Sequence, residues 1–298
     1  NFSMSEMGFP ERGVDEAEAD TAGPEREVEP FIYKPYPSAD ELGVVRPEWA
    51  HRYKEDAAKH WDSFYARNTL KAYKDRHYLG SEFAELADSS RRRTVIELGC
   101  GVGNTVFPML EANSNLFAFA CDFSPKGVEM VKTNPRYDPA RIRAAVCDIT
   151  CGSLPAEFGE VRADIATLIF VLGSIAPLKM GAAIRTAASG LRDGGRLFFR
   201  DHAVEDLAQQ RFETSSEPKR IEENLYVRRD NTLSYYFSLE VVQELFAPLF
   251  DVERLEFTIR RLENRKEGLQ MERKFVTGVF RLRASGAPTA ELPSLDEQ

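Results

Sequence analysis

Three acidic residues of this 298-residue chain stand at or near the ends of apolar runs that read as strands. Glu97 lies in TVIEL, Asp122 ends LFAFACD and Asp148 ends RAAVCD. Because the carboxyl ends of parallel strands meet at one edge of a sheet, we expect the three acids to lie near one another. Core packing does not account for acids there. A cationic ligand that carries a ribose would suit such an edge.

A glycine-rich turn follows the first of these strands, in the string E-L-G-C-G-V-G-N. Gly99, Gly101 and Gly103 permit a tight turn and a close approach of a ligand to the main chain, and Asn104 is the expected N-cap of the next helix. A dinucleotide fingerprint has its third glycine where this chain has Asn104, whereas Asp122 follows at about the 20-residue spacing of a ribose-binding acid. The pattern suits a cationic ligand with a free ribose, of which S-adenosylmethionine is one, and the alternative is a tight turn of another α/β unit.

The elements that would position these residues alternate between strand and helix, which predicts an α/β fold with a Rossmann-like core at about 93–203. Strands are expected at 94–98, 116–122, 143–148, 165–172 and 196–201, with helices beginning near 104, 124, 178 and 204. A turn at Gly194–Gly195 should precede the fifth strand. After an insertion at about 204–237, a helix at 238–249 and two strands at 250–263 and 273–283 should close the domain as a hairpin.

Charge is distributed unevenly along the chain, whose formal net charge is −9. Residues 1–30 hold nine acids and two arginines, and residues 284–298 hold three acids and no basic residue. We therefore expect two disordered acidic tails around a body of nearly neutral charge. Residues 254–283 are basic, which is compatible with phosphate contacts, although a solvated charged surface explains the same composition equally well.

Several classes of protein are disfavoured by the composition. No apolar run approaches 18 residues, so a membrane span is not expected, and the first 30 residues lack the apolar core of a signal peptide. The four cysteines form no C-x-x-C pair, so we expect neither a metal site nor disulfides, and we interpret them as small buried residues. The expected location is the cytoplasm, with the nucleus as an alternative.

Seven groups of motifs occur in one order along the chain: WDSFYARN, KDRHYL, ELGCGVGN, CDFSP with NPRYD, CDIT with LIFVL, LFFRD, and NLYVRRDNTLSYYF with KEGLQMERKFV. Over roughly residues 45–283 they resemble the tRNA 3-methylcytidine methyltransferases, which are class I S-adenosylmethionine-dependent enzymes. The resemblance implies a Rossmann-like domain at 93–283, with a mixed, mostly parallel seven-stranded sheet and helices on both faces. It also implies that residues 31–92 form an aromatic-rich helical extension that covers the cofactor or contacts RNA.

The resemblance further implies a cofactor site for S-adenosylmethionine. Its residues would be Trp61, Tyr65, Gly99, Gly101, Gly103, Asp122, Asp148, Ile149 and Ile169. Asp122 would bind the ribose hydroxyls and Asp148 the adenine amino group. Trp61 and Tyr65 share one helix face, and aromatic residues at that spacing more often belong to a core than to a cofactor site.

A second set of residues is expected at the substrate: Arg76, Arg200, Asp201, His202 and Arg228. Asp201 ends RLFFRD, so its carboxylate should lie at the same edge as the cofactor, where it could stabilise a base that becomes cationic. The alternative for Asp201 is an N-cap of the following helix. Arg76 and Arg228 are expected to contact the base or a phosphate, or else to form surface ion pairs.

The resemblance predicts methylation of N3 of cytidine at position 32 of a tRNA anticodon loop. The tRNA anticodon stem-loop is the expected partner, and an aminoacyl-tRNA synthetase or another adaptor protein is left open. Two residues depart from the family pattern, since His202 replaces a tyrosine and Leu233 an arginine in the part expected to face RNA. The alternatives are a methyltransferase of the same fold acting on another RNA or a small molecule, and a non-catalytic subunit that binds RNA or cofactor.

Overall fold

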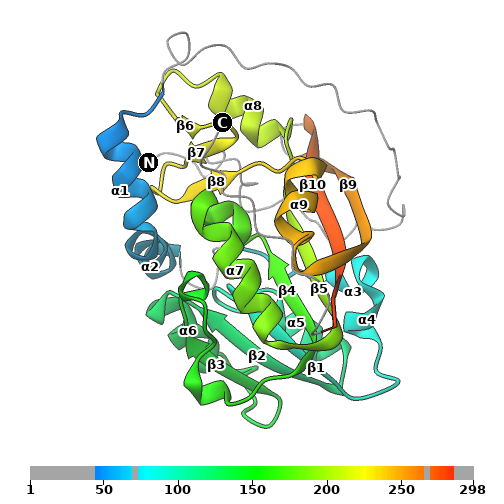
Figure 1. Cartoon of the computed structure of the whole chain (residues 1–298). Helices are drawn as coiled ribbons and strands as arrows, with labels where there is room; N and C mark the ends of the chain where they lie inside the picture. Colours follow the sequence, from blue (N-terminus) through cyan, green and yellow to red (C-terminus); the bar gives the residue numbers. More distant parts are fainter. Residues whose placement is uncertain (1–43, 69–72, 265–268, 285–298) are drawn as a thin grey trace.

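A computed structural model describes residues 44–68, 73–264 and 269–284 of the chain (Figure 1). Its centre is a seven-stranded sheet in the order β3-β2-β1-β4-β5-β10-β9. β1 to β5 are parallel, and β10 pairs antiparallel with both β5 and β9. The strands are β1 Arg93–Leu98, β2 Leu116–Asp122, β3 Ile142–Val146, β4 Ala163–Ile169, β5 Leu191–His202, β9 Phe250–Asn264 and β10 Leu269–Leu282. The tails expected at 1–30 and from 285 onward lie outside the described residues.

The expected strands and closing hairpin are confirmed, and one turn is corrected. β2 has the bounds that its apolar run predicts, and β9 and β10 pair along their lengths. The turn expected at Gly194–Gly195 is instead part of β5, which begins at Leu191. The register with β4 shifts between Ala163 and Ile165, and Gly194 has a φ of 67°. The glycines therefore form a bulge within β5, and the strand continues through them.

Helices cover both faces of the sheet, because strand residues point alternately to opposite sides. Ile165 and Phe198 pack on the face covered by α3 to α6, whereas Leu168 and Phe199 pack on the face covered by α7 and α9. The helices are α3 Leu79–Glu82, α4 Ala84–Ala87, α5 Val106–Ala112, α6 Pro125–Lys132, α7 Pro177–Ser189 and α9 Leu239–Phe246. This is the mixed, mostly parallel α/β sheet that the sequence predicts.

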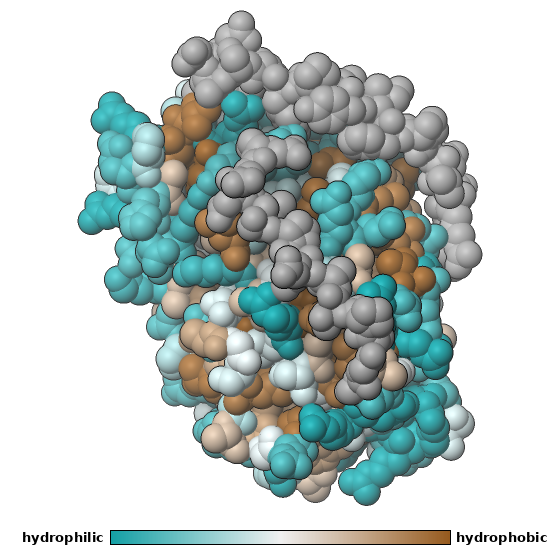
Figure 2. Space-filling model, in the orientation of Figure 1, coloured by the Kyte–Doolittle hydropathy of each residue, from teal (hydrophilic) through white to brown (hydrophobic). Residues whose placement is uncertain are grey.

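The N-terminal helices and the insertion pack together over one end of the sheet (Figure 1). The helices are α1 Pro47–Glu55 and α2 Ala57–Asn68, and the insertion holds α8 Leu207–Glu213 and a small antiparallel sheet of β6 Arg220–Glu222, β7 Leu225–Val227 and β8 Leu233–Tyr235. Val44 bridges to Arg220, Val45 shares an apolar cluster with Ile221, and Lys54 pairs with Glu222. The surface over α1 and α2 is mainly hydrophilic (Figure 2).

The short helices α3 and α4 are held to the sheet by apolar and ionic contacts. Leu79 and Phe83 are buried against the face that carries Phe198. One oxygen of Glu82, Oε2, lies 3.3 Å from both the Arg200 and the Arg260 guanidinium nitrogens. The Arg200 and Glu82 side chains are only 1% and 5% exposed, so this pair is buried.

The structure also bears on the membrane, metal and cysteine expectations. No helix among residues 44–68, 73–264 and 269–284 is long and apolar enough to cross a bilayer. Within those ranges, no group of three or more His, Cys, Asp or Glu side chains is arranged to hold a metal ion. Cys100 and Cys121 are buried as expected, but Cys151 is exposed, so the interpretation as small buried residues is wrong for Cys151.

The Glu82 pair yields a stability prediction. Glu82→Gln removes the negative charge that two guanidinium groups share, so Arg200 keeps a buried charge without its counter-ion. We expect the free energy of unfolding to fall by about 3 kcal/mol, the scale of a broken buried pair. Glu85→Gln, which removes the partially exposed partner of Arg196, should cost about 1 kcal/mol or less. Equal losses in urea denaturation of the two variants would contradict this difference.

Candidate active site

The glycine turn after β1 is fastened to the end of β2. The Asp122 carboxylate accepts hydrogen bonds from the Gly101 N–H at 2.8 Å and the Ser124 N–H at 2.9 Å. Burial raises the pKa of Asp122 to about 6, and the two backbone bonds oppose that shift. Gly99, Gly101 and Gly103 have φ of 76°, 52° and 95°, a region that glycine adopts without strain. The turn therefore brings its backbone close to a buried carboxyl group.

Helix α2 places Tyr65 directly over this turn. A Cβ on Gly101 would lie 2.7 Å from the Tyr65 hydroxyl, so a larger residue there would displace the Tyr65 ring. The Trp61 ring lies 5.6 Å from the Tyr65 ring, and its Nε1 is buried with no partner in the described part of the chain. Asp62 fixes the helix by accepting hydrogen bonds from the Ser124 hydroxyl at 2.6 Å and the backbone N–H of residue 126 at 3.0 Å. Both expected aromatic residues thus reach the candidate cofactor site, although they also form a buried cluster.

The acid expected after β3 differs from Asp122 in its exposure. Asp148 is exposed and accepts hydrogen bonds from the backbone N–H and hydroxyl of Thr150, so it caps a short 3-10 helix, Ile149–Cys151. Ile149 is buried among residues of the α7 face, whereas Ile169 ends β4 and packs on the opposite face. These three residues lie at the ends of β3 and β4, as the sequence predicts.

Glu97 at the end of β1 is the most perturbed carboxyl group of this edge. Burial raises its pKa to about 8, while the charge of Arg76 and hydrogen bonds from Thr105 and Val106 oppose the shift. Its Oε2 is buried without a partner among the described residues. Arg76 donates to the Thr105 hydroxyl at 2.7 Å. The sequence places Glu97 among the acids of this edge, which would suit a cationic ligand, but it does not assign Glu97 an individual contact.

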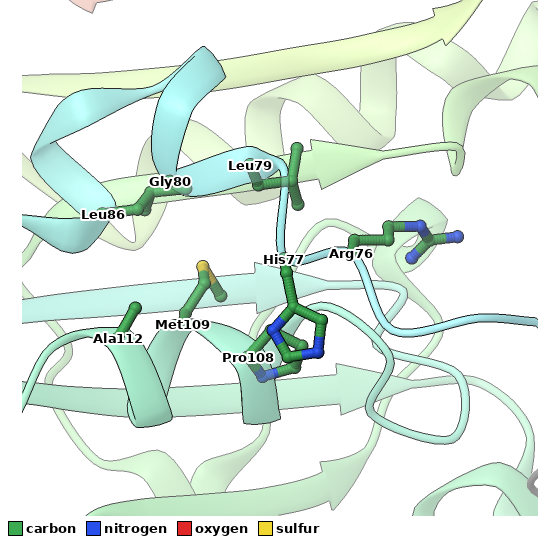
Figure 3. A pocket seen from close by; sticks show the side chains of 8 residues that line it. All are labelled: Arg76, His77, Leu79, Gly80, Leu86, Pro108, Met109 and Ala112. Atoms are coloured by element: carbon green, nitrogen blue, oxygen red, sulfur yellow. The ribbon is translucent and has the colours of Figure 1, made fainter. Parts of the chain in front are cut away.

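Figure 3 shows a small pocket between α3, α4 and α5, below this edge. Its lining is mostly apolar: Arg76, His77, Leu79, Gly80, Leu86, Pro108, Met109 and Ala112. The Arg76 guanidinium points away from the other lining residues, in the direction of the strand arrowheads (Figure 3). No acid lines the pocket, so a cationic ligand would find no counter-charge in it, whereas Arg76 reaches the carboxyl edge.

Asp201 is buried near the end of β5. Its carboxylate accepts hydrogen bonds from the Gly173 N–H and the His202 N–H, both at 2.9 Å. Burial raises its pKa to about 7, against the effect of these bonds and of the Arg76 charge. A Cβ on Gly173 would lie 2.7 Å from Oδ1, so glycine there leaves room for the carboxylate. The N-cap alternative for Asp201 is wrong, because Asp206 caps α8.

An aromatic cluster with arginines surrounds His202, the residue after Asp201 in β5. The His202 ring lies 5.2 Å from Phe170 and 5.7 Å from Phe275, and the Arg76 guanidinium lies 5.2 Å from Phe170. Burial lowers the pKa of His202 to about 3, so its ring is neutral at physiological pH. Phe170 has a φ of 59°, a strained conformation for a bulky residue that is typical of functional sites. Neither Phe170 nor Phe275 was predicted, because their approach depends on the pairing of distant strands.

Arg200 and Arg228 lie in surroundings that the sequence did not predict. Arg200 is on the opposite side of β5 from Asp201, where it binds Glu82 and donates to the Thr277 hydroxyl at 2.8 Å. Arg228 pairs with Asp230 at 3.2 Å, and both side chains are buried, so the surface ion pair alternative is wrong. A role of either arginine at the substrate stays a prediction.

Two further expectations are corrected. Leu233, expected to face RNA, is 2% exposed and packs in the apolar cluster of the small sheet. Asn104 does not cap α5; its amide donates at 3.0 Å to the Tyr73 carbonyl and to Asp75, and the cap position is Thr105. Asn104 therefore ties the glycine turn to the segment that carries Arg76, a contact that the local sequence could not show.

Comparisons with known proteins agree with this arrangement. A family model described as a methyltransferase domain matches residues 65–248. A Schizosaccharomyces pombe protein named tRNA N(3)-methylcytidine methyltransferase is 40% identical over 237 residues, which are 78% of this chain and 95% of that protein. The chain belongs to the tRNA N3-methylcytidine methyltransferase family.

A second relative agrees with this family assignment, and one solved structure matches the fold. A Saccharomyces cerevisiae member named tRNA(Thr) (cytosine(32)-N(3))-methyltransferase is 40% identical over 237 residues, which are 76% of this chain but 37% of that longer protein. A crystal structure of an S-adenosylmethionine-dependent methyltransferase from Anabaena variabilis has a TM-score of 0.52 at 13% identity and covers 81% of this chain and 97% of its own. At that identity the likeness shows the fold alone.

The Glu97 carboxyl yields a stability prediction for this family member. In the folded protein it keeps its proton up to about pH 8, whereas its usual pKa is 4.5, so the native state loses stability as pH rises between these values. Glu97→Gln cannot ionise and should be more stable than wild type at pH 8, by roughly 2–4 kcal/mol, with little difference at pH 4.5. Denaturant titrations at both pH values measure this. Glu129→Gln, at an exposed site, is the control, and the same pH effect there would contradict the prediction.

Proposed function

We propose that this protein transfers a methyl group from S-adenosylmethionine to N3 of cytidine in tRNA, at position 32 of the anticodon loop. The observation that carries the proposal is Asp201, a buried carboxyl group that is held by two backbone N–H groups at the carboxyl edge of the sheet and influenced by the charge of Arg76. The names of the two yeast relatives support the substrate and the position.

The chemistry of N3 accounts for a carboxylate without a separate base. N3 of neutral cytosine already has a lone pair, so no proton must be removed before methyl transfer. The methylated ring is cationic, and a fixed carboxylate would stabilise the charge that develops in the transition state. N3 lies on the base-pairing edge, so the target base must be unpaired and held by stacking. Phe170, His202 and Phe275 supply aromatic surfaces for this.

The residues at β1 and β2 fit S-adenosylmethionine, which supplies an electrophilic methyl group when bound. The glycines form a tight turn at the carboxyl end of β1, and Asp122 beside this turn lies where ribose hydroxyls can donate to it. Glu97 Oε2 and Trp61 Nε1 are buried polar atoms without partners, an acceptor and a donor that a ligand could satisfy. Asp148, Ile149 and Ile169 would border the adenine.

The macromolecular partner in this proposal is the tRNA anticodon stem-loop. An aminoacyl-tRNA synthetase or another adaptor protein that supplies further affinity stays a prediction. We place the reaction in the cytoplasm or the nucleus, where tRNA is made and used.

The cofactor part is tested by calorimetry with S-adenosylhomocysteine, for which we expect micromolar affinity. Asp122→Ala should weaken binding by roughly 100-fold, because the ribose hydroxyls lose their charged acceptor and the glycine turn loses the bond that fixes it. Asp148→Ala, at an exposed acid, should have a smaller effect. Tight binding of NADH with none of S-adenosylhomocysteine would contradict the cofactor proposal.

The catalytic part is tested with Asp201→Asn. Single-turnover methylation of an anticodon stem-loop should fall by roughly 10²–10³-fold while cofactor affinity changes little, because the charge acts mainly in the transition state. In wild type the rate should fall as pH drops through about 7, where Asp201 takes up a proton, and the residual rate of Asp201→Asn should lack this dependence. Mass spectrometry of the nucleosides measures the product.

Controls separate this proposal from its alternatives. In Asp201→Asn, the amide NH₂ group would face one of the two backbone N–H groups that now donate to the carboxylate, which could destabilise the variant. We therefore measure its unfolding and compare rates at a temperature at which both proteins are folded. A stem-loop with uridine at position 32 and a fully paired duplex should not react. An unchanged rate for Asp201→Asn would remove its catalytic role. Wild type that binds cofactor and RNA without turnover would favour the non-catalytic subunit.

A further inference from the structure

Arg228 joins the insertion to the helix that covers the glycine turn. Its guanidinium carbon lies 5.7 Å from the centre of the Trp61 ring and 5.9 Å from that of Phe64. Asp230 holds the same guanidinium at 3.2 Å, and Tyr73 forms a hydrogen bond with it. Because Arg228 is 8% exposed, these contacts are shielded from water, where a cation–π contact is stronger than at an exposed site.

The aromatic rings under Arg228 continue to the cofactor site. Trp61 and Tyr65 are neighbours at 5.6 Å, and the Tyr65 hydroxyl lies against Gly101. Helix α2 is also held by Asp62, which binds the N-terminus of α6. Two independent attachments therefore set the position of α2: one from the core through Asp62, and one from the insertion through Arg228.

The Asp230 carboxylate makes the second attachment rigid. It accepts hydrogen bonds from the Thr232 N–H at 3.1 Å and the Thr232 hydroxyl at 2.6 Å, which close the turn between β7 and β8. The backbone of Arg228 both donates to the Thr232 carbonyl and accepts from the Asn231 N–H. These hydrogen bonds restrict the turn and the Arg228 side chain, so the guanidinium is held in place against the Trp61 ring.

We propose that Arg228 is a positioning residue for the cofactor: from the β7–β8 turn it holds Trp61 and, through it, Tyr65 against the glycine turn. The inference rests on the proposed cofactor site and assigns to Arg228 a role that needs no contact with RNA. In this proposal, the insertion affects the affinity for the cofactor through the buried side chain of Arg228.

The chain offers a direct reporter, because Trp49 and Trp61 are its only tryptophans. In a Trp49→Phe background, the emission of Trp61 reports its own surroundings with and without S-adenosylhomocysteine. Arg228→Met keeps a long unbranched side chain and removes the cation. We expect its dissociation constant for S-adenosylhomocysteine to rise by roughly tenfold, the scale of one shielded cation–π contact. The Trp61 emission of the unliganded protein should change, and saturating ligand should return it toward that of wild type.

Two control variants make the test specific. Arg229→Met removes a positive charge from the same turn at an exposed side chain, and its affinity and emission should match those of wild type. Arg228→Lys keeps the charge without the planar guanidinium and should recover part of the affinity. Affinities are measured well below the unfolding temperature of each variant, so a merely destabilised protein would keep its dissociation constant.

The outcomes distinguish this inference from the proposed function. An Arg228→Met protein with wild-type affinity and unchanged Trp61 emission would overturn the positioning role while leaving the cofactor site intact. Equal losses in Arg228→Met and Arg229→Met would also overturn it, because the effect would then come from the charge of the turn. Wild type that does not bind S-adenosylhomocysteine would refute the cofactor proposal itself.

Discussion

The carboxyl edge of the sheet is shaped by one physical constraint: the carboxyl groups of Glu97, Asp122 and Asp201 are buried away from water. Burial raises the pKa values of Glu97, Asp122 and Asp201 to about 8, 6 and 7. Such groups lower the stability of the fold at neutral pH, so the surrounding structure must supply other stabilising contacts. Arg76 lowers the pKa values of Glu97 and Asp201, but not enough to offset the effect of burial.

The parts of the fold that follow from local pattern could be predicted from the sequence. A strand in a parallel sheet is buried on both faces, so LFAFACD marks β2 from end to end, and the long runs of β9 and β10 indicate a hairpin. The small sheet of the insertion could not be predicted in the same way. Its strands have three residues each, and contacts with Val45, with Tyr53 of α1 and with Phe212 of α8 help to stabilise them.

The candidate site shows the same division between local and distant information. The positions of glycines and acids at strand ends can be predicted from the sequence, because the topology of a parallel sheet brings them to one edge. The direction of a long side chain cannot be predicted in this way. Arg76 and Arg200 both lie near the edge, but Arg76 points toward the ends of the strands (Figure 3), whereas Arg200 is bound by Glu82. Asn104 binds the distant Tyr73 carbonyl instead of capping the next helix. The helix cap considered for Asp201 is supplied instead by Asp206, five residues further along the chain.

The attachment of α3 and α4 also has a consequence for the order of events during synthesis. Glu82 is made early, but its partner Arg260 follows 178 residues later, near the end of the sheet. At ribosomal rates of 5–20 residues per second, the early segment waits about 10–40 s for that partner. During this time Leu79 and Phe83 have no completed sheet to cover, so the nascent chain exposes apolar surface until β5 and the hairpin emerge. Chaperones that bind exposed apolar segments would therefore find α3 and α4 uncovered during this time.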